Sequence, residues 1–142
     1  MKTLNIYLNF SGTTEKAFNF YKSAFGKEFS TFQRFKDVPG SEKMLAEVQE
    51  LMMHVALPLT DAVTLMGSDT NAEMRKNLTV GNNVHLSIEA ESKEETERVF
   101  NILSAGGKVT MALGDTFWGA YYGSCVDQFG VSWLINYTYP KK

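Results

Sequence analysis

The chain has 142 residues, of which 44% are hydrophobic and 21% charged, and its formal net charge is −2. This length and composition fit one folded domain over residues 1–142 and exclude a disordered chain. The lysines and arginines are scattered and no apolar run approaches the roughly 20 residues of a membrane span, so we expect neither a nucleic-acid nor a membrane partner. The single cysteine, Cys125, excludes an internal disulfide and favours a reducing, cytoplasmic location.

The first half of the chain predicts a strand, a helix and three further strands. Apolar and polar residues alternate over 5–10, which indicates a strand with one covered face. A helix follows, with Ser11 or Thr13 as its N-cap and Gly26 at its C-terminal end. The three further strands are predicted over 28–35, 50–57 and 62–67.

The second half predicts the same order of elements. Residues 83–90 alternate as a strand does, and Ser92 with Glu95 forms a capping box that starts a helix. Gly106 and Gly107 follow the helix, where a C-cap needs positive φ. The three further strands are predicted over 108–113, 118–126 and 131–139.

An internal repeat relates the two halves. Residues 18–27 read FNFYKSAFGK and residues 100–108 read FNILSAGGK, each at the end of a predicted helix. Repeated supersecondary units bury together what neither buries alone. We therefore predict an α+β fold of two βαβββ modules, about 1–68 and 82–142 with a linker at 69–81, that form one curved mixed sheet with the helices outside.

Four stretches resemble the vicinal oxygen chelate superfamily and, within it, the PhnB-like branch. They are residues 19–26 (NFYKSAFG), 52–57 (MMHVAL) with 63–69 (VTLMGSD), 117–123 (FWGAYYG) and 127–133 (DQFGVSW). The resemblance implies the glyoxalase/bleomycin-resistance fold, a cup-shaped sheet that holds a small ligand, and a homodimer. Some members of the superfamily are metalloenzymes and others bind a ligand without metal, so the fold alone does not define the function.

The residues at the family's metal-ligand positions argue against a divalent metal. Alignment on the repeated motifs places the superfamily's two histidines at Asn83 and near Tyr7 or Asn5, and its two glutamates at Leu65 and Leu134. A catalytic metal needs about three protein ligands, and leucine supplies none. His85, two positions from Asn83, would be a lone ligand, so we expect no metal or other cofactor.

The two histidines, His54 and His85, are the candidate catalytic residues. Each alternates with neighbours on a predicted strand and has a side chain that transfers protons near neutral pH. A structural histidine at the sheet surface or a dimer contact is the alternative for both.

The candidate ligand pocket is predominantly aromatic. Strict alternation would place Phe117 and Tyr121 on one side of a strand and Trp118 and Tyr122 on the other, where one pair could stack on a flat ligand. Packing in the core or at a dimer interface is the alternative. The full set of predicted pocket residues is Tyr7, Asn9, Asn83, Phe117, Trp118, Tyr121, Tyr122 and Trp133.

Three functions remain open from the sequence. The first is metal-independent binding of a small, partly aromatic molecule, as in the sequestering resistance proteins. The second is a lyase, isomerase or transferase that acts on a small oxygenated substrate, with His54 or His85 as proton carrier. The third is a dimer without a ligand. PhnB-like proteins are often labelled as methyltransferases, but this chain has no glycine-rich nucleotide loop, so we discount that activity.

Overall fold

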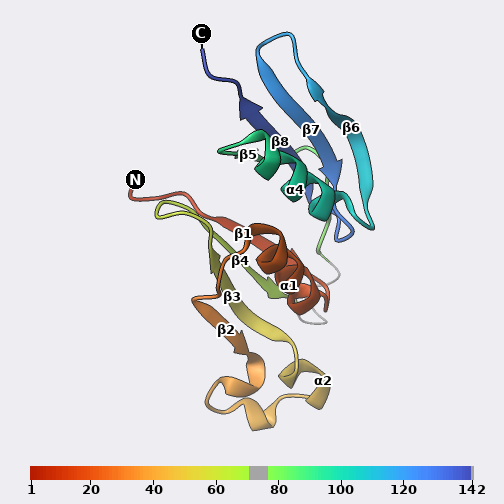
Figure 1. The fold of residues 1–142 in the computed structure, drawn as a ribbon. Coiled ribbons are helices and arrows are strands. Elements are labelled where there is room, and N and C mark those ends of the chain that lie inside the picture. The colour runs from red at the N-terminus through yellow and green to blue at the C-terminus, as the bar shows by residue number, and fades with distance from the viewer. Residues whose placement is uncertain (71–76, 142) are drawn as a thin grey trace. The chain divides into compact units, whose positions relative to one another are not determined.

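The computed structural model describes residues 1–70 and 77–141. Residues 71–76, within the predicted linker 69–81, lie outside the described residues. The chain divides into two units, Met1–Thr79 and Val80–Lys142 (Figure 1). Each unit holds a βαβββ module, which confirms the predicted fold class, but each module forms a four-stranded sheet of its own instead of the one shared sheet that was predicted.

The first unit forms a four-stranded sheet in the order β1-β4-β3-β2, in which β1 and β4 are parallel and the other pairs antiparallel. Its main elements are β1 (Ile6–Phe10), α1 (Thr14–Phe25), β2 (Thr31–Arg34), β3 (Met52–Pro58) and β4 (Thr64–Asp69). Short helices that the sequence did not predict join β2 to β3: two 3-10 turns (Phe35–Asp37 and Ser41–Lys43) and α2 (Ala46–Gln49).

The second unit repeats this topology in the order β5-β8-β7-β6, again with its first pair parallel. Its elements are β5 (Leu86–Glu89), α4 (Lys93–Ser104), β6 (Lys108–Asp115), β7 (Ala120–Val126) and β8 (Ser132–Thr138). The predicted elements are therefore present in the predicted order, with shifted ends.

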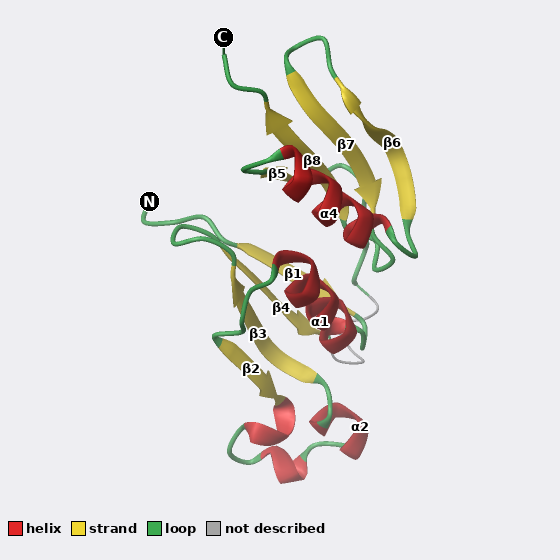
Figure 2. Ribbon diagram, in the orientation of Figure 1, coloured by secondary structure: helices red, strands yellow, loops and turns green. Residues whose placement is uncertain are grey.

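One long helix covers one face of each sheet (Figure 2). Phe18 of α1 lies so close to Gly67 of β4 that a Cβ there would come within 2.6 Å of its ring. Phe100 of α4 lies in the same way over Gly123 of β7, where the distance would be 2.9 Å. The two phenylalanines of the internal repeat thus fix which face of each sheet is covered.

The helix caps differ between the two units. Ser92 caps α4 as predicted, with its hydroxyl accepting from the Glu95 N–H at 3.0 Å. Thr13 stands at the N-cap of α1 but its side chain makes no capping bond. Asp69 at the end of β4 replaces it, since one carboxylate oxygen accepts from the N–H groups of Gly12 and Thr14.

The strand predicted over 118–126 begins later, at Ala120. Phe117 and Trp118 lie in the turn between β6 and β7, where Gly119 has a φ of 86°. A left-handed residue interrupts the regular alternation of side chains, so the predicted pairing of Phe117 with Tyr121 on one strand face is wrong.

Within the described residues, none of the helices has both the length and the apolar character needed to cross a membrane.

Candidate functional site

We call the face of each sheet that lies opposite its long helix the open face. Because Gly67 faces α1, its neighbours on β4 and their strand partners point the other way. The open face of the first sheet carries Tyr7, Asn9, His54, Ala56, Met66 and Ser68. By the same reasoning from Gly123, the open face of the second sheet carries Ser87, Glu89, Tyr122, Ser124, Leu134 and Asn136.

Tyr7 and His54 meet on the open face of the first sheet. The Tyr7 hydroxyl lies 3.2 Å from His54 Nδ1, and the two rings stack with centroids 5.7 Å apart. Tyr7 is 46% exposed and His54 is half-buried. This hydrogen bond holds one ring nitrogen of His54, so Nε2 is the nitrogen left to meet a ligand.

Asn9 lies two residues along β1 from Tyr7, on the same open face. Its side-chain oxygen accepts a hydrogen bond from the Ser68 hydroxyl at 3.3 Å. The structure therefore brings three of the predicted site residues of the first unit, Tyr7, Asn9 and His54, onto one face.

Trp118 and Tyr122 form the aromatic part of the second open face. Their ring centroids are 5.9 Å apart in an edge-to-face arrangement, and Phe117 packs on Trp118 at 4.9 Å. Trp118 is 55% exposed and Phe117 almost fully exposed. These three predicted pocket residues lie together although two of them belong to a turn.

Tyr121 and Trp133 lie on the covered face of the second sheet. The Tyr121 hydroxyl donates to Glu97 of α4 at 3.0 Å, and burial and this carboxylate raise the pKa of Tyr121. Trp133 is 1% exposed, and its indole N–H donates to Asp127 at 2.8 Å. The structure gives both side chains packing roles beside α4 instead of positions on the open face.

Asn83 and His85 precede the second sheet. Both are exposed, and β5 begins only at Leu86. They are therefore on a connecting segment, and the strand alternation predicted over 83–90 holds only for its second half.

The sequence analysis missed two polar residues on the second open face, Glu89 and Asn136. The carboxylate of Glu89 accepts from Asn136 Nδ2 at 2.6 Å and from the Thr138 N–H at 2.8 Å. The polar side of the alternating segment already contained Glu89, so the same signal that singled out His85 would have found it. Asn136 had only its alternation with the buried Ile135 as a signal.

The expected metal-ligand positions need one correction. Leu65 is fully buried on the covered face of β4, and the open-face residue beside it is Met66. Leu134 does lie on the open face of β8. The open-face positions of these two strands hold Thr64, Met66, Ser68, Ser132, Leu134, Asn136 and Thr138, so neither strand offers a carboxylate on that face. Among residues 1–70 and 77–141, no three His, Cys, Asp or Glu side chains are grouped closely enough to hold a metal ion.

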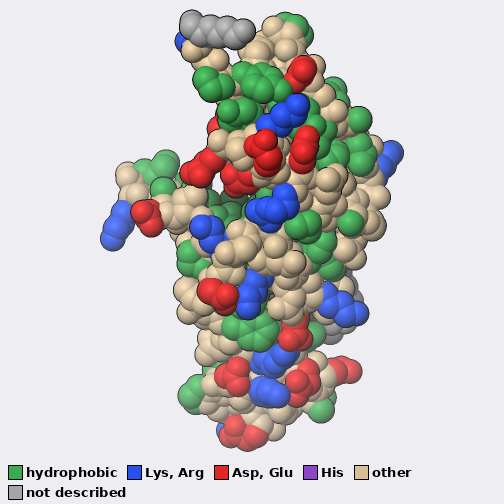
Figure 3. All heavy atoms as spheres, viewed as in Figure 1, with side chains coloured by type: hydrophobic (Ala, Val, Ile, Leu, Met, Phe, Trp, Pro, Cys, Tyr) green, Lys and Arg blue, Asp and Glu red, His purple; other side chains and the backbone are tan. Residues whose placement is uncertain are grey.

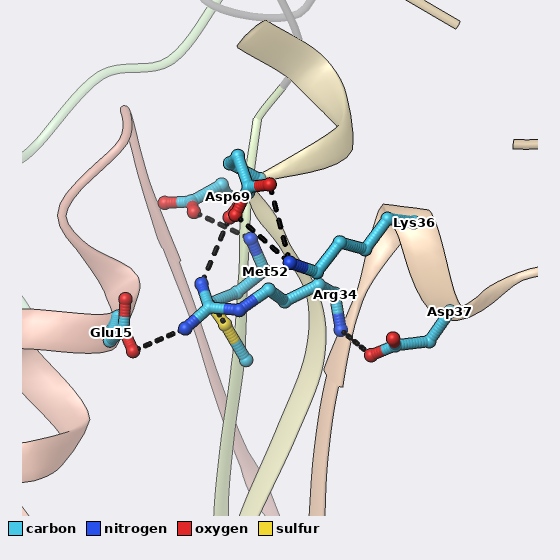
Figure 4. Close-up of polar contacts among 7 residues, drawn as sticks. Glu15, Arg34, Lys36, Asp37, Met52 and Asp69 are labelled. Atoms are coloured by element: carbon cyan, nitrogen blue, oxygen red, sulfur yellow. Dashed lines mark hydrogen bonds and ion pairs between the residues drawn. The ribbon is translucent and has the colours of Figure 1, made fainter. Parts of the chain in front are cut away.

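A charged cluster at the edge of the first sheet has a structural explanation (Figure 4). The guanidinium of Arg34 binds Glu15 of α1 at 2.5 Å and donates to the carbonyl oxygen of Glu50 at 3.0 Å. The hydrogen bond from Glu15 raises the pKa of Arg34, and Lys36 pairs with the Glu50 carboxylate at 3.3 Å. These contacts fasten β2 to the helix and to the segment before β3.

Basic and acidic side chains are interspersed on the face shown in Figure 3. A nucleic-acid site usually shows a continuous stripe of Lys and Arg. On this face acidic side chains interrupt the basic ones.

Two βαβββ modules in one chain form the glyoxalase/bleomycin-resistance fold. The same fold occurs in a glyoxalase/bleomycin resistance protein/dioxygenase family enzyme from Burkholderia phytofirmans PsJN, which covers 97% of this chain and 98% of its own at 18% identity and a TM-score of 0.59.

Within that class, the chain belongs to the PhnB-like family described as 3-demethylubiquinone-9 3-methyltransferase, whose model matches residues 2–136. It is 31% identical to Protein YjdN of Escherichia coli (strain K12) over 137 residues, which cover 94% of this chain and 93% of that protein. Protein PA1353 from Pseudomonas aeruginosa is 33% identical with a TM-score of 0.80 and coverage of 96% and 97%. A PhnB protein from Bacillus cereus is 26% identical with a TM-score of 0.77 and coverage of 95% and 98%.

Proposed function

We propose that this protein binds a small, partly aromatic molecule on the open faces of its sheets and does so without a metal. The observation that supports this best is that each open face carries an aromatic pair that water reaches: Tyr7 with His54, and Trp118 with Tyr122. Such rings offer a flat apolar surface with polar tips, which is the usual lining of small-molecule sites.

Metal independence is supported by the residues that a metal would need. The last strand of each sheet points threonine, serine, methionine, leucine or asparagine toward its open face. On the second open face the carboxylate of Glu89 on β5 lies beside β8, but one carboxylate falls short of the about three protein ligands that a catalytic metal needs, and among the described residues no three such side chains are grouped.

A thermal-shift screen tests the binding proposal. A panel of aromatic metabolites and antibiotics is screened against the wild-type protein, and a compound that binds the native state raises the melting temperature. Trp118→Ala and Tyr7→Ala remove one ring from each open face, and Phe32→Ala removes an exposed ring from β2 as the matched control. Shifts that vanish in an open-face variant but persist in the control support the proposal. Shifts that no variant alters, or a panel without any shift, contradict it.

The contact between Tyr7 and His54 favours a second candidate function, proton transfer on a small oxygenated substrate. In the tautomer whose Nδ1–H donates to the Tyr7 hydroxyl oxygen, His54 Nε2 carries no proton and could abstract one beside a carbonyl. Deuterium incorporation into dihydroxyacetone in D₂O, followed by NMR, measures this step. Exchange that stops in His54→Gln and persists in His85→Gln supports His54 as the carrier. Exchange equal to that of buffer contradicts it.

Methyl transfer, which the family description names, is left out of the proposal because the chain lacks a glycine-rich nucleotide loop.

The proposal also includes a cytoplasmic homodimer. The free, buried thiol of Cys125 supports the cytoplasmic location. Two exposed apolar side chains on β6, Val109 and Met111, support a dimer interface. Light scattering of the purified protein tests the dimer.

A further inference from the structure

Three side chains form a row across the open face of the second sheet. Glu89 of β5 pairs with Asn136 of β8, and Asn136 pairs with Tyr122 of β7. Neighbouring strands lie about 4.8 Å apart, so the row spans about 10 Å between the first and third backbones. The ring of Trp118, from the turn before β7, contacts the Tyr122 ring with the centroids 5.9 Å apart.

The end of the row at Glu89 carries a negative charge. Burial tends to raise the pKa of Glu89, but hydrogen bonds from Asn136 and Thr138 lower it, and the net direction is downward. A carboxylate accepts about four hydrogen bonds, and the donors of Asn136 and Thr138 leave it room for a further donor. Within residues 1–70 and 77–141, Glu89 has no lysine or arginine partner.

The other end of the row is aromatic. Trp118 stands between Phe117 and Tyr122 with edge-to-face contacts to both, and more than half of it is exposed. Indole and phenol rings stack on flat ligands and also attract cations. The row thus presents an aromatic surface and a carboxylate at a separation that one small molecule can span.

We propose that the open face of the second sheet binds a flat aromatic molecule that carries an organic cation, with the ring against Trp118 and Tyr122 and the cation at Glu89. This inference rests on the proposed binding function and adds the ligand class. Asn136 orients the carboxylate by its hydrogen bond, and a ligand ammonium group occupies the remaining acceptor positions.

Three probes of similar shape but different charge test the inference: phenylbutylamine, phenylbutanol and phenylbutyrate. Trp118 is the exposed one of the two tryptophans, since Trp133 is buried, so binding is followed by Trp118 fluorescence and by calorimetry. We expect the amine to bind about tenfold more tightly than the alcohol, as for a hydrogen bond to a charged group. The acid should bind most weakly.

Two charge-removing variants complete the design. Glu89→Gln keeps an oxygen for the Thr138 N–H but loses the charge, so it should weaken binding of the amine about tenfold and leave the alcohol nearly unchanged. Glu94→Gln removes the same charge from an exposed position on α4 and should change neither affinity.

The inference is overturned if the alcohol or the acid binds as tightly as the amine, if Glu89→Gln leaves the amine affinity unchanged, or if none of the three probes binds. Failure of the binding function is distinguishable from failure of the charge assignment through Trp118→Ala. If that variant abolishes binding of the neutral alcohol, aromatic binding stands and only the cation is lost. If the alcohol binds equally well to Trp118→Ala, the result contradicts both the cation site and the aromatic binding site on this face.

Discussion

The hydroxyl of Tyr7 reaches His54 Nδ1 across an intervening strand. Tyr7 lies on β1 and His54 on β3, and β4 separates them in the sheet. Their strands are therefore about 10 Å apart, and the tyrosine side chain lies over the open face to make the contact. A long-range hydrogen bond of this kind fixes both rings with a single interaction.

Replacing Tyr7 with phenylalanine should change the tautomer of His54. If the Tyr7 hydroxyl donates to Nδ1, the neutral imidazole carries its proton on Nε2, and loss of the donor leaves a mixture of tautomers. Long-range ¹H–¹⁵N NMR spectra of the histidine side chains measure this directly. The cost in unfolding free energy should be about 1 kcal/mol or less, because the contact is exposed.

His85 is the internal control for this experiment, because its spectrum should be the same in both proteins. A His54 that already carries its proton on Nδ1 in the wild type at high pH would show that Tyr7 accepts the hydrogen bond. That outcome contradicts donation by Tyr7 and leaves Nε2 in the form that proton abstraction requires.

Much of the first open face could be predicted from the sequence. The alternation over 5–10 placed Tyr7 and Asn9 on one side of a strand, and the same reasoning applied to His54. The contact between Tyr7 and His54 could not be predicted, because it depends on β4 lying between their strands. Strand order is a property of the tertiary fold and leaves no local pattern in either segment.

The aromatic stretch shows where alternation fails. Phe117 and Trp118 read as part of a strand because β-forming residues continue through them, yet Gly119 turns the chain with positive φ. Trp133 fails for a different reason. It lies on a strand as predicted, but on the covered face of the second sheet, where the carboxylate of the buried Asp127 accepts from its indole N–H.

Asp69 should be one of the most important side chains for the stability of the first unit. It is 6% exposed, and its carboxylate accepts from three backbone N–H groups, those of Gly12, Thr14 and Met52. Asp69→Ala leaves these donors without a partner in a buried site, so we expect a loss of about 3–5 kcal/mol in unfolding free energy. Urea denaturation followed by circular dichroism measures it.

Asp61→Ala provides the comparison for Asp69→Ala, since Asp61 is exposed on the loop before β4 and should cost less than about 0.5 kcal/mol. Equal losses for the two variants would show that the cap on α1 adds no stability of its own.

Gly67 is required by the close packing of Phe18. An added Cβ would lie 2.6 Å from the Phe18 ring and 2.8 Å from the carbonyl oxygen of Leu8, and the latter is backbone. Gly67→Ala should therefore lower the unfolding free energy by about 1–3 kcal/mol through overpacking, measured by urea denaturation. Gly114→Ala, on β6 where a Cβ meets nothing within 4 Å, should be neutral or slightly stabilising. A neutral Gly67→Ala would mean that α1 can move away from the sheet at little cost.

Cys125 should make the protein less stable in alkaline solution. Burial, with a smaller effect from Asp127, raises the pKa of its thiol from 9.0 to about 11. Between these values the unfolded chain loses the thiol proton while the folded chain keeps it, so the unfolding free energy falls as the pH rises from about 9 toward 11. The contribution is fully present below pH 9, and its loss should reach about 2 kcal/mol at pH 11.

Cys125→Ala isolates this contribution, because the variant keeps every other side chain that titrates at alkaline pH. Urea denaturation of both proteins at several pH values should give a difference in unfolding free energy that is constant below pH 9 and shifts by about 2 kcal/mol in favour of the variant at pH 11. The same burial should keep the native thiol unreactive toward iodoacetamide at pH 8 until urea exposes it, since only the thiolate reacts. Rapid labelling of the native protein, together with a difference that does not depend on pH, would show that Cys125 is reached by solvent in the folded state.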